Sequence, residues 1–175
     1  MEQNTMLNQI DVGTYFEIIQ FLHYELKLLD DRNFDDWLMV LSTDIDYKVP
    51  VRVTKEKDEG KEFSNKSFHY LDDYYSIQMR INRLKTKHAW AEDPPSRTRH
   101  FISNIQVSPA LKDNEYHVTS NLMVYRGRGD SPLGDILSGE RHDLIRKIRN
   151  GWEVGKRTVL LDQTTLPTFN LSFFI

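Results

Sequence analysis

Apolar residues recur at steps of three and four near the start of the chain, which predicts an amphipathic helix over residues 11–29. Asp11 occupies the N-cap position, where a side-chain oxygen accepts a hydrogen bond from an otherwise unpaired backbone N–H. The predicted buried face of this helix consists of Val12, Tyr15, Phe16, Ile19, Leu22, Leu26 and Leu29. After a tight turn, Asn33 predicts the cap of a second, shorter helix with apolar positions at Phe34, Trp37, Leu38 and Leu41.

The pattern changes after the second helix. β-Branched residues predict a strand over residues 44–54, interrupted at Pro50, and the charged or small residues 55–66 predict an exposed loop. A helical period then returns at Leu71, Tyr74, Ile77, Ile81 and Leu84. Asp72 and Asp73 at the start of this third helix suit its dipole. Two adjacent prolines predict an ordered turn or extended loop over residues 91–96.

Beyond residue 97 the chain has the character of strands. Strands are predicted over 99–107, 116–126, 136–148 and 152–162. The last two are joined at Asn150-Gly151, a strong hairpin signal because both positions of such a turn favour positive φ. Helices followed by a run of strands predict an α+β fold, with N-terminal helices packed on one curled, mostly antiparallel sheet.

Length and charge limit the class of protein. The chain has 175 residues, which predicts a single domain over 1–175 with a conventional core. Its formal net charge of −3 argues against nucleic acid or an anionic membrane surface as a partner. There is no run of 18 apolar residues, and Glu2, Asp11 and Glu17 interrupt any signal-peptide pattern. We therefore expect a cytoplasmic protein.

The chain contains no cysteine, which excludes structural disulfides, a cysteine nucleophile and any Fe–S cluster held by this chain alone. Its six histidines form no His-Glu-x-x-His motif, and no two of them lie three or four residues apart. A Gly-x-Ser-x-Gly nucleophile motif is also absent. These patterns predict no catalytic residue, cofactor site or metal site in this chain.

The last residues are unusually apolar for a chain end. Phe169, Leu171, Phe173 and Ile175 alternate, and Phe174 lies between two of them. Chain ends are usually polar and frayed, so these side chains are expected to be buried. A final core strand of this domain and an interface with another subunit are both compatible with the pattern.

Several charged residues fall within the predicted strands or just before one: Arg97, Arg99, Glu140, Arg141, Asp143, Arg157 and Asp162. They could line a pocket, but such charges more often form ion-pair networks across a sheet or between subunits. A curled sheet can also enclose a cavity in which acid–base chemistry takes place. Tyr15, Asp35 and His100 are the residue types that such a site would use, although nothing in their spacing demands it.

Several blocks of sequence, in order, carry a resemblance to a known family. They are residues 90–100 (Trp-Ala-Glu-Asp-Pro-Pro-Ser-Arg-Thr-Arg-His), 102–104, 139–144, 156–162 and 170–174, with 28–30, Trp37 and 44–50 upstream. From about residue 15 onward the chain resembles the small (β) subunit of aromatic-ring-hydroxylating dioxygenases, most closely the biphenyl, toluene and polycyclic-hydrocarbon branch. Small subunits of this family often have a longer arm before the first helix, whereas about ten residues precede it here, so the resemblance does not extend to the contacts of such an arm.

The resemblance implies a cone of the nuclear-transport-factor-2-like type and a structural, non-catalytic role. It implies a large (α) subunit that carries a Rieske 2Fe-2S cluster and a mononuclear non-haem iron, with three α and three β subunits assembled. The small subunits would form one trimeric layer of copies of this chain. The complex would add O2 to an aromatic hydrocarbon to give a cis-dihydrodiol. Electrons would come from NADH through a reductase and a ferredoxin.

Eight residues are expected to position loops and subunit contacts or to pack the tail: Trp90, Arg97, Arg99, Arg141, Asp143, Arg157, Asp162 and Phe173. Two other functions remain open from the residues alone. A free-standing dehydratase or isomerase would use a deep polar pocket and a shifted carboxylate or histidine pKa. A small-ligand binding module would instead be stabilised by its ligand.

Overall fold

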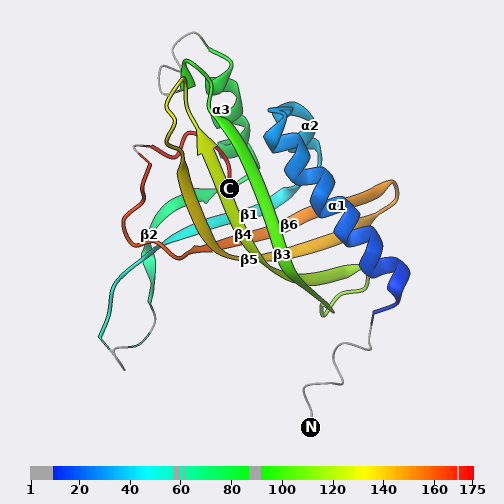
Figure 1. The fold of residues 1–175 in the computed structure, drawn as a ribbon. Coiled ribbons are helices and arrows are strands. Elements are labelled where there is room, and N and C mark those ends of the chain that lie inside the picture. The colour runs from blue at the N-terminus through cyan, green and yellow to red at the C-terminus, as the bar shows by residue number, and fades with distance from the viewer. Residues whose placement is uncertain (1–9, 57–59, 61, 87–91, 169) are drawn as a thin grey trace.

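The computed structural model describes residues 10–56, 60, 62–86, 92–168 and 170–175. In chain order its elements are α1 (Val12–Asp30), α2 (Phe34–Met39), β1 (Leu41–Arg52), β2 (Phe63–Asp72), α3 (Tyr74–Leu84), β3 (Arg97–Pro109), β4 (Glu115–Gly127), β5 (Asp135–Ile148) and β6 (Gly151–Leu161). One strongly twisted sheet curls around the helices, and α1 lies alongside β3 (Figure 1). The predicted α+β fold is confirmed.

The sheet has the strand order β2-β1-β6-β5-β4-β3. The pair β1–β6 is parallel, and all the other neighbouring pairs are antiparallel. The parallel pair places Lys48 opposite Thr158, so the first strand joins the sheet beside the last one. The sheet is therefore mixed but mostly antiparallel. We call the body formed by its concave face and the helices packed on that face the cone.

Helix α1 begins as predicted but buries a different face at its start. The Asp11 carboxylate accepts a hydrogen bond from the Thr14 N–H at 2.9 Å, which is the expected N-cap. Val12, Tyr15 and Phe16 are 84%, 38% and 60% exposed, so the prediction that they are buried was wrong. Ile18 is the first buried residue of the helix, because the first turns of the helix lie outside the hydrophobic core. The buried positions are Ile18, Phe21, Leu22, Glu25, Leu26, Leu28 and Leu29.

The second helix and the strand after it differ from prediction at their boundaries. Asn33 occupies the cap position of α2, but its side chain makes no capping hydrogen bond. Leu41 starts β1 instead of ending the helix. Pro50 does not interrupt β1, because shifts of register on both sides of Pro50 accommodate the missing N–H.

Strand β2 was missed, because residues 55–66 were predicted to form a loop. The strand begins at Phe63 and pairs only with β1, at one edge of the sheet. Edge strands commonly carry polar residues, which hides their alternation in the sequence. Leu71 also belongs to β2 and not to the following helix. That helix, α3, has Asp73 as its N-cap, with a hydrogen bond of 2.8 Å from the Ser76 N–H.

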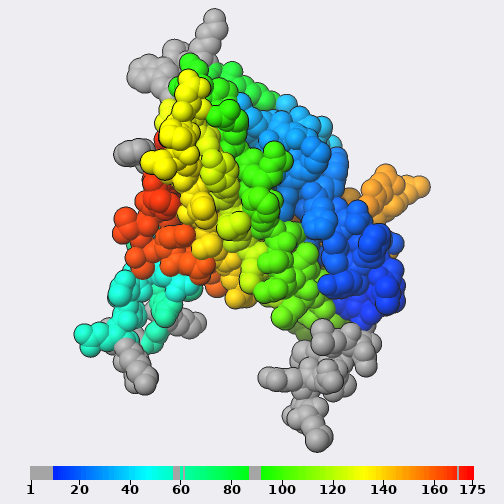
Figure 2. Space-filling model, viewed as in Figure 1, coloured from blue at the N-terminus to red at the C-terminus, as the bar shows by residue number. Residues whose placement is uncertain are grey.

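The hairpin between β5 and β6 is confirmed, but its turn is shifted by one residue. Ile148 pairs with Gly151, so the two loop residues are Arg149 and Asn150. Gly151 alone has the positive φ, at 133°, and it already belongs to β6. The tip of this hairpin projects from the body of the molecule (Figure 2).

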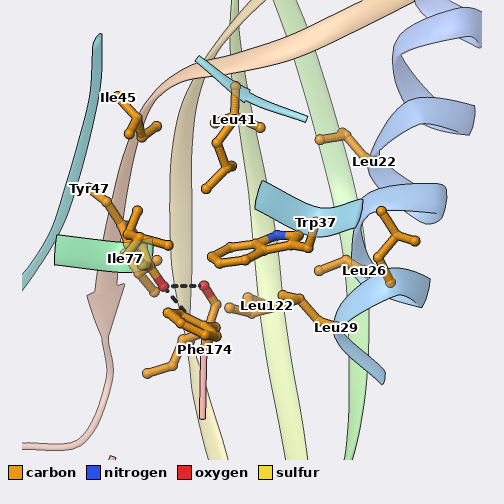
Figure 3. Close-up of a cluster of buried hydrophobic side chains, with 14 of the residues drawn as sticks. Leu22, Leu26, Leu29, Trp37, Leu41, Ile45, Tyr47, Ile77, Leu122 and Phe174 are labelled. Carbon is orange, nitrogen blue, oxygen red and sulfur yellow. Dashed lines mark hydrogen bonds between the residues drawn. The ribbon is translucent and has the colours of Figure 1, made fainter. Parts of the chain in front are cut away.

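Trp37 lies at the centre of the cone and is 1% exposed (Figure 3). Side chains from α1, β1, α3 and β4 surround it, including Leu26, Tyr47, Ile77 and Leu122. The chain end reaches the same core, and Phe174 lies against the Trp37 ring. The apolar side chains at the end of the chain were expected to be buried in this domain or against another subunit. In the tail, here residues 170–175, Phe173, Phe174 and Ile175 are buried in this domain, whereas Phe169 lies outside the described residues. None of residues 170–175 forms a strand. Among the described residues no helix is long and apolar enough to span a membrane.

Candidate functional site in the interior of the cone

Four charged side chains meet inside the cone. Glu25 comes from α1, Arg141 and Asp143 from β5, and Arg157 from β6, and each is at most 4% exposed. The antiparallel ladder places Asp143 directly opposite Arg157. The two strands thus present both arginines and one acid on the concave face, and α1 brings the second acid onto them. We call these four residues the buried charge cluster.

Arg157 is the centre of the buried charge cluster, because its guanidinium binds both acids. It donates to the two Glu25 oxygens at 2.8 and 3.2 Å and to the two Asp143 oxygens at 2.9 and 3.2 Å. Arg141 lies 3.0 Å from Asp143 and 3.4 Å from Glu25. The Trp37 indole N–H completes the shell of Glu25 with a hydrogen bond of 2.6 Å. Two positive and two negative charges balance, as buried charges require.

The pKa shifts follow from this balance. Burial by itself raises the pKa of Glu25, but attraction to Arg157 and Arg141 and hydrogen bonds from Arg157 and Trp37 lower it to about 2. Burial likewise opposes the charge of Arg157, yet Asp143 and Glu25 hold its pKa well above the ordinary value. Burial and the neighbouring Arg157 lower the pKa of Arg141. Glu25 and Arg157 are thus both charged at neutral pH.

We expect acid to destabilise the fold through Glu25. A carboxyl with a folded-state pKa near 2 and an ordinary value of 4.5 stabilises the fold above pH 4.5 and loses that contribution as the pH falls toward 2. The loss is on the order of 3 kcal/mol. Urea unfolding of the full chain between pH 7 and pH 2 measures it. Glu25→Gln should flatten this part of the pH profile, whereas Glu17→Gln, at an exposed site on the same helix, should not. Equal profiles in both variants would contradict the assignment.

The second component of the interior is the tail. Side chains from five elements bind its backbone: Tyr47 from β1, Tyr70 from β2, Arg80 from α3, His100 from β3 and Arg126 from β4. The Tyr47 hydroxyl donates to the main-chain oxygen of Ile175 at 2.6 Å and accepts from the Ile175 N–H at 3.2 Å. Burial raises the pKa of Tyr47 to about 12, so it remains a donor. Side chains of the sheet and of α3 therefore hold the tail by its backbone.

Arg126 of β4 joins the tail to the loop that precedes β3. Its guanidinium donates to Ser96 Oγ at 2.8 Å and to Glu92 Oε1 at 2.7 Å. It also donates to the Asn170 carbonyl oxygen at 3.2 Å and lies 4.8 Å from the ring centroid of Phe173. Burial would raise the pKa of Glu92, but hydrogen bonds from Ser172 and Ser96 and the charge of Arg126 lower it.

The three residues proposed for acid–base chemistry do not meet. Tyr15 lies in the first turns of α1 and bonds the Ile105 carbonyl oxygen, whereas His100 bonds Asp30 at the far end of that helix. Fifteen residues of helix separate Tyr15 from Asp30, which is about 22 Å. Asp35 is exposed and pairs with Lys85. Beside His100 lies a cavity of about 20 Å³, which has room for a single water molecule.

The eight expected site residues fall into two groups. Arg141, Asp143, Arg157 and Phe173 are buried inside the cone. Arg97, Arg99 and Asp162 are exposed: Arg97 donates to the Gly129 carbonyl oxygen, Arg99 lies 3.5 Å from Asp30, and Asp162 lies 3.8 Å from Arg52. Trp90 lies outside the described residues. Within the part of the chain that the structure describes, no group of three His, Cys, Asp or Glu side chains is placed to hold a metal ion.

Sequence reasoning missed Glu25 and Arg126. Glu25 lies three or four residues from Phe21, Leu22, Leu28 and Leu29, so its position on the apolar face was a signal in the helical period. Arg126 had a weaker signal, because it continues the inward alternation of Leu122 and Val124 along β4. Both patterns indicate that a charged side chain is buried, but neither predicts which residue pairs with it.

Among the described residues, three helices pack on the concave face of one curled sheet, and the buried charge cluster and the tail fill the space between them. This arrangement is the fold of the nuclear-transport-factor-2-like type. Among solved structures, naphthalene 1,2-dioxygenase with indole bound superimposes with a TM-score of 0.85 at 22% identity, covering 97% of this chain and 90% of that one. A protein assigned as a scytalone dehydratase from Novosphingobium aromaticivorans gives a TM-score of 0.61 at 13% identity, covering 94% and 90%. These likenesses show the shared fold.

The family follows from closer sequence similarity. The ring hydroxylating beta subunit family matches residues 24–168. The beta subunit of biphenyl 2,3-dioxygenase from Rhodococcus jostii is 40% identical over 170 residues, which cover 94% of this chain and 90% of that one. The chain belongs to the family of ring-hydroxylating dioxygenase beta subunits. The alternative of a free-standing dehydratase or isomerase is not favoured.

Proposed function

We propose that this chain is the structural, non-catalytic subunit of an aromatic-ring dioxygenase and acts by assembly with a large α subunit. One observation carries the proposal: the interior of the cone is filled with its own side chains. A cone-fold enzyme needs an open, substrate-sized pocket there. In this chain Trp37, the buried charge cluster and the tail occupy that space. The helices, sheet and tail share this core, which also supports one domain over residues 1–175.

The reaction then belongs to the assembled complex. From its membership in the family of ring-hydroxylating dioxygenase beta subunits, we infer a large subunit that holds a Rieske 2Fe-2S cluster and a mononuclear iron. This chain has no cysteine to supply the two thiolates that a Rieske cluster needs. The complex would add O2 to an aromatic hydrocarbon and form a cis-dihydrodiol. Electrons from NADH would pass through a reductase and a ferredoxin in the cytoplasm. Three α and three β subunits, with the β subunits in one layer, is the expected stoichiometry.

The exposed and buried site residues would have different roles in this assembly. Arg97, Arg99 and Asp162 have exposed side chains that neighbouring subunits can reach. We propose that they form or orient subunit contacts. The buried members instead hold the sheet and the tail in place, and so act on the interface only through the fold.

A pull-down of the tagged full chain from its native host, grown on an aromatic carbon source, tests the proposal. We expect an equimolar larger partner, a native mass that fits three copies of each chain and Rieske-type visible absorption. A chain that is recovered alone and colourless would contradict the proposal.

Variants test the exposed contacts. Arg99→Ala and Asp162→Ala should each weaken retention of the large subunit about tenfold, which corresponds to about 1.4 kcal/mol. The matched control is Lys112→Ala, at an exposed position in the turn between β3 and β4. Thermal unfolding of each isolated variant shows whether the fold itself has changed. If both variants retained the large subunit as well as the control does, Arg99 and Asp162 would not be interface residues.

A further inference from the structure

The tail is buried without joining the sheet. Phe173, Phe174 and Ile175 are at most 5% exposed, which is the burial expected of a core strand. Yet among the described residues no backbone–backbone hydrogen bond involves residues 170–175. Buried backbone groups need partners, so other groups must supply them here. The tail is thus held by a mode of binding different from that of every strand in the fold.

Side chains supply those partners. The carbonyl oxygens of residues 170, 171, 173, 174 and 175 each lie within 3.2 Å of a polar side-chain atom. The five side chains are Tyr47, Tyr70, Arg80, His100 and Arg126, from β1, β2, α3, β3 and β4. Polar side chains that converge on the main chain of an irregular segment are typical of a cleft that binds a peptide.

One side chain of the tail fits a dedicated aromatic pocket. The ring of Phe174 lies 4.4 Å from Trp37 and 5.8 Å from Phe34, centroid to centroid, and the Arg80 guanidinium lies 5.2 Å from its centroid. Figure 3 shows Phe174 and Trp37 in contact at the centre of the core. Aromatic anchors in buried pockets supply most of the affinity in peptide recognition.

We propose that the cone is a peptide-binding site and that the tail binds in it as a separable ligand. The ligand is a peptide that contains two adjacent aromatic residues followed by an aliphatic one, as in Phe173-Phe174-Ile175. The five polar side chains bind its carbonyl groups, and the Trp37 pocket selects the aromatic ring. The side chains that bind the backbone of the tail come from β1, β2, α3, β3 and β4, so these contacts do not involve the covalent link through residues 163–167. This inference does not depend on which subunit the chain assembles with.

Cutting the chain after it has folded tests the proposal. A protease recognition sequence inserted between Thr164 and Thr165, which are exposed, allows the full chain to be cleaved in its native state. The segment after β6 lies on the surface, where a protease can reach it (Figure 2). We expect residues 165–175 to stay bound through gel filtration with an unchanged circular dichroism spectrum. We also expect a fluorescent synthetic peptide of residues 165–175 to exchange into the cleaved protein.

Two matched variants sharpen the test. Tyr47→Phe removes the hydroxyl that binds Ile175 and should weaken the labelled peptide about three- to tenfold. Tyr24→Phe removes an exposed hydroxyl on α1 and should leave the affinity unchanged. A peptide with Phe174→Ala should fail to compete with the labelled peptide. Collapse of the spectrum on cleavage, release of the fragment without rebinding, or equal affinities in both variants would overturn the proposal.

Discussion

Glu25→Gln is expected to lower the free energy of unfolding by about 3–5 kcal/mol, because it leaves a buried positive charge without its partner. The amide keeps the size of the side chain but removes one of two negative charges facing Arg141 and Arg157. Solvent cannot replace the missing charge, since both arginines are at most 1% exposed. Urea unfolding of the full chain at pH 7 measures the loss.

The matched control for this prediction lies on the same helix. Glu17→Gln removes a carboxylate that pairs with Lys147 at 3.0 Å where both side chains are about half exposed, and should change stability by at most about 1 kcal/mol. Adding Arg141→Met to Glu25→Gln restores neutrality and leaves the bidentate Arg157–Asp143 pair intact. The double variant should therefore recover part of the stability. Equal losses for Glu17 and Glu25, or no recovery, would show that charge balance does not control this site.

Elements with a strong local signal could be predicted from the sequence. Asp11 and the apolar period define α1, and the alternation of Val118, Leu122 and Val124 defines β4. The hairpin signal at Gly151 also located the β5–β6 connection to within one residue. These features depend on neighbours along the chain, so the sequence contains nearly all of the information that determines them.

Features that depend on distant partners could not be predicted in the same way. Strand β2 exists because β1 supplies its ladder, and its own residues Ser64, Asn65 and Lys66 carry no β pattern. Arg157 was recognised as a charge within a strand, but its partner Glu25 lies 132 positions away. The burial of the tail followed from its composition, whereas its irregular path follows from side chains on five other elements.

Phe174→Ala should also destabilise the fold by about 3–5 kcal/mol, because it empties the aromatic pocket beside Trp37. The Phe174 side chain is 2% exposed, and the cavity of about 20 Å³ beside His100 already reaches it. Truncation would enlarge that cavity, and the rings of Trp37 and Phe34 cannot collapse into it while α2 holds their backbone. Phe174→Leu keeps most of the apolar volume and should lose less than half as much.

Phe101 provides the control, since it is a phenylalanine on the outer face of β3 and is 51% exposed. Phe101→Ala should cost at most about 1 kcal/mol, because its ring is already half in water. Urea unfolding of the full chain, followed by circular dichroism and tryptophan fluorescence, measures both variants. Trp37 lies 4.4 Å from Phe174, so its emission should shift in the native state of Phe174→Ala only. Similar losses at the two phenylalanines would mean that the tail adds little to the core and that the sheet and helices are stable without it.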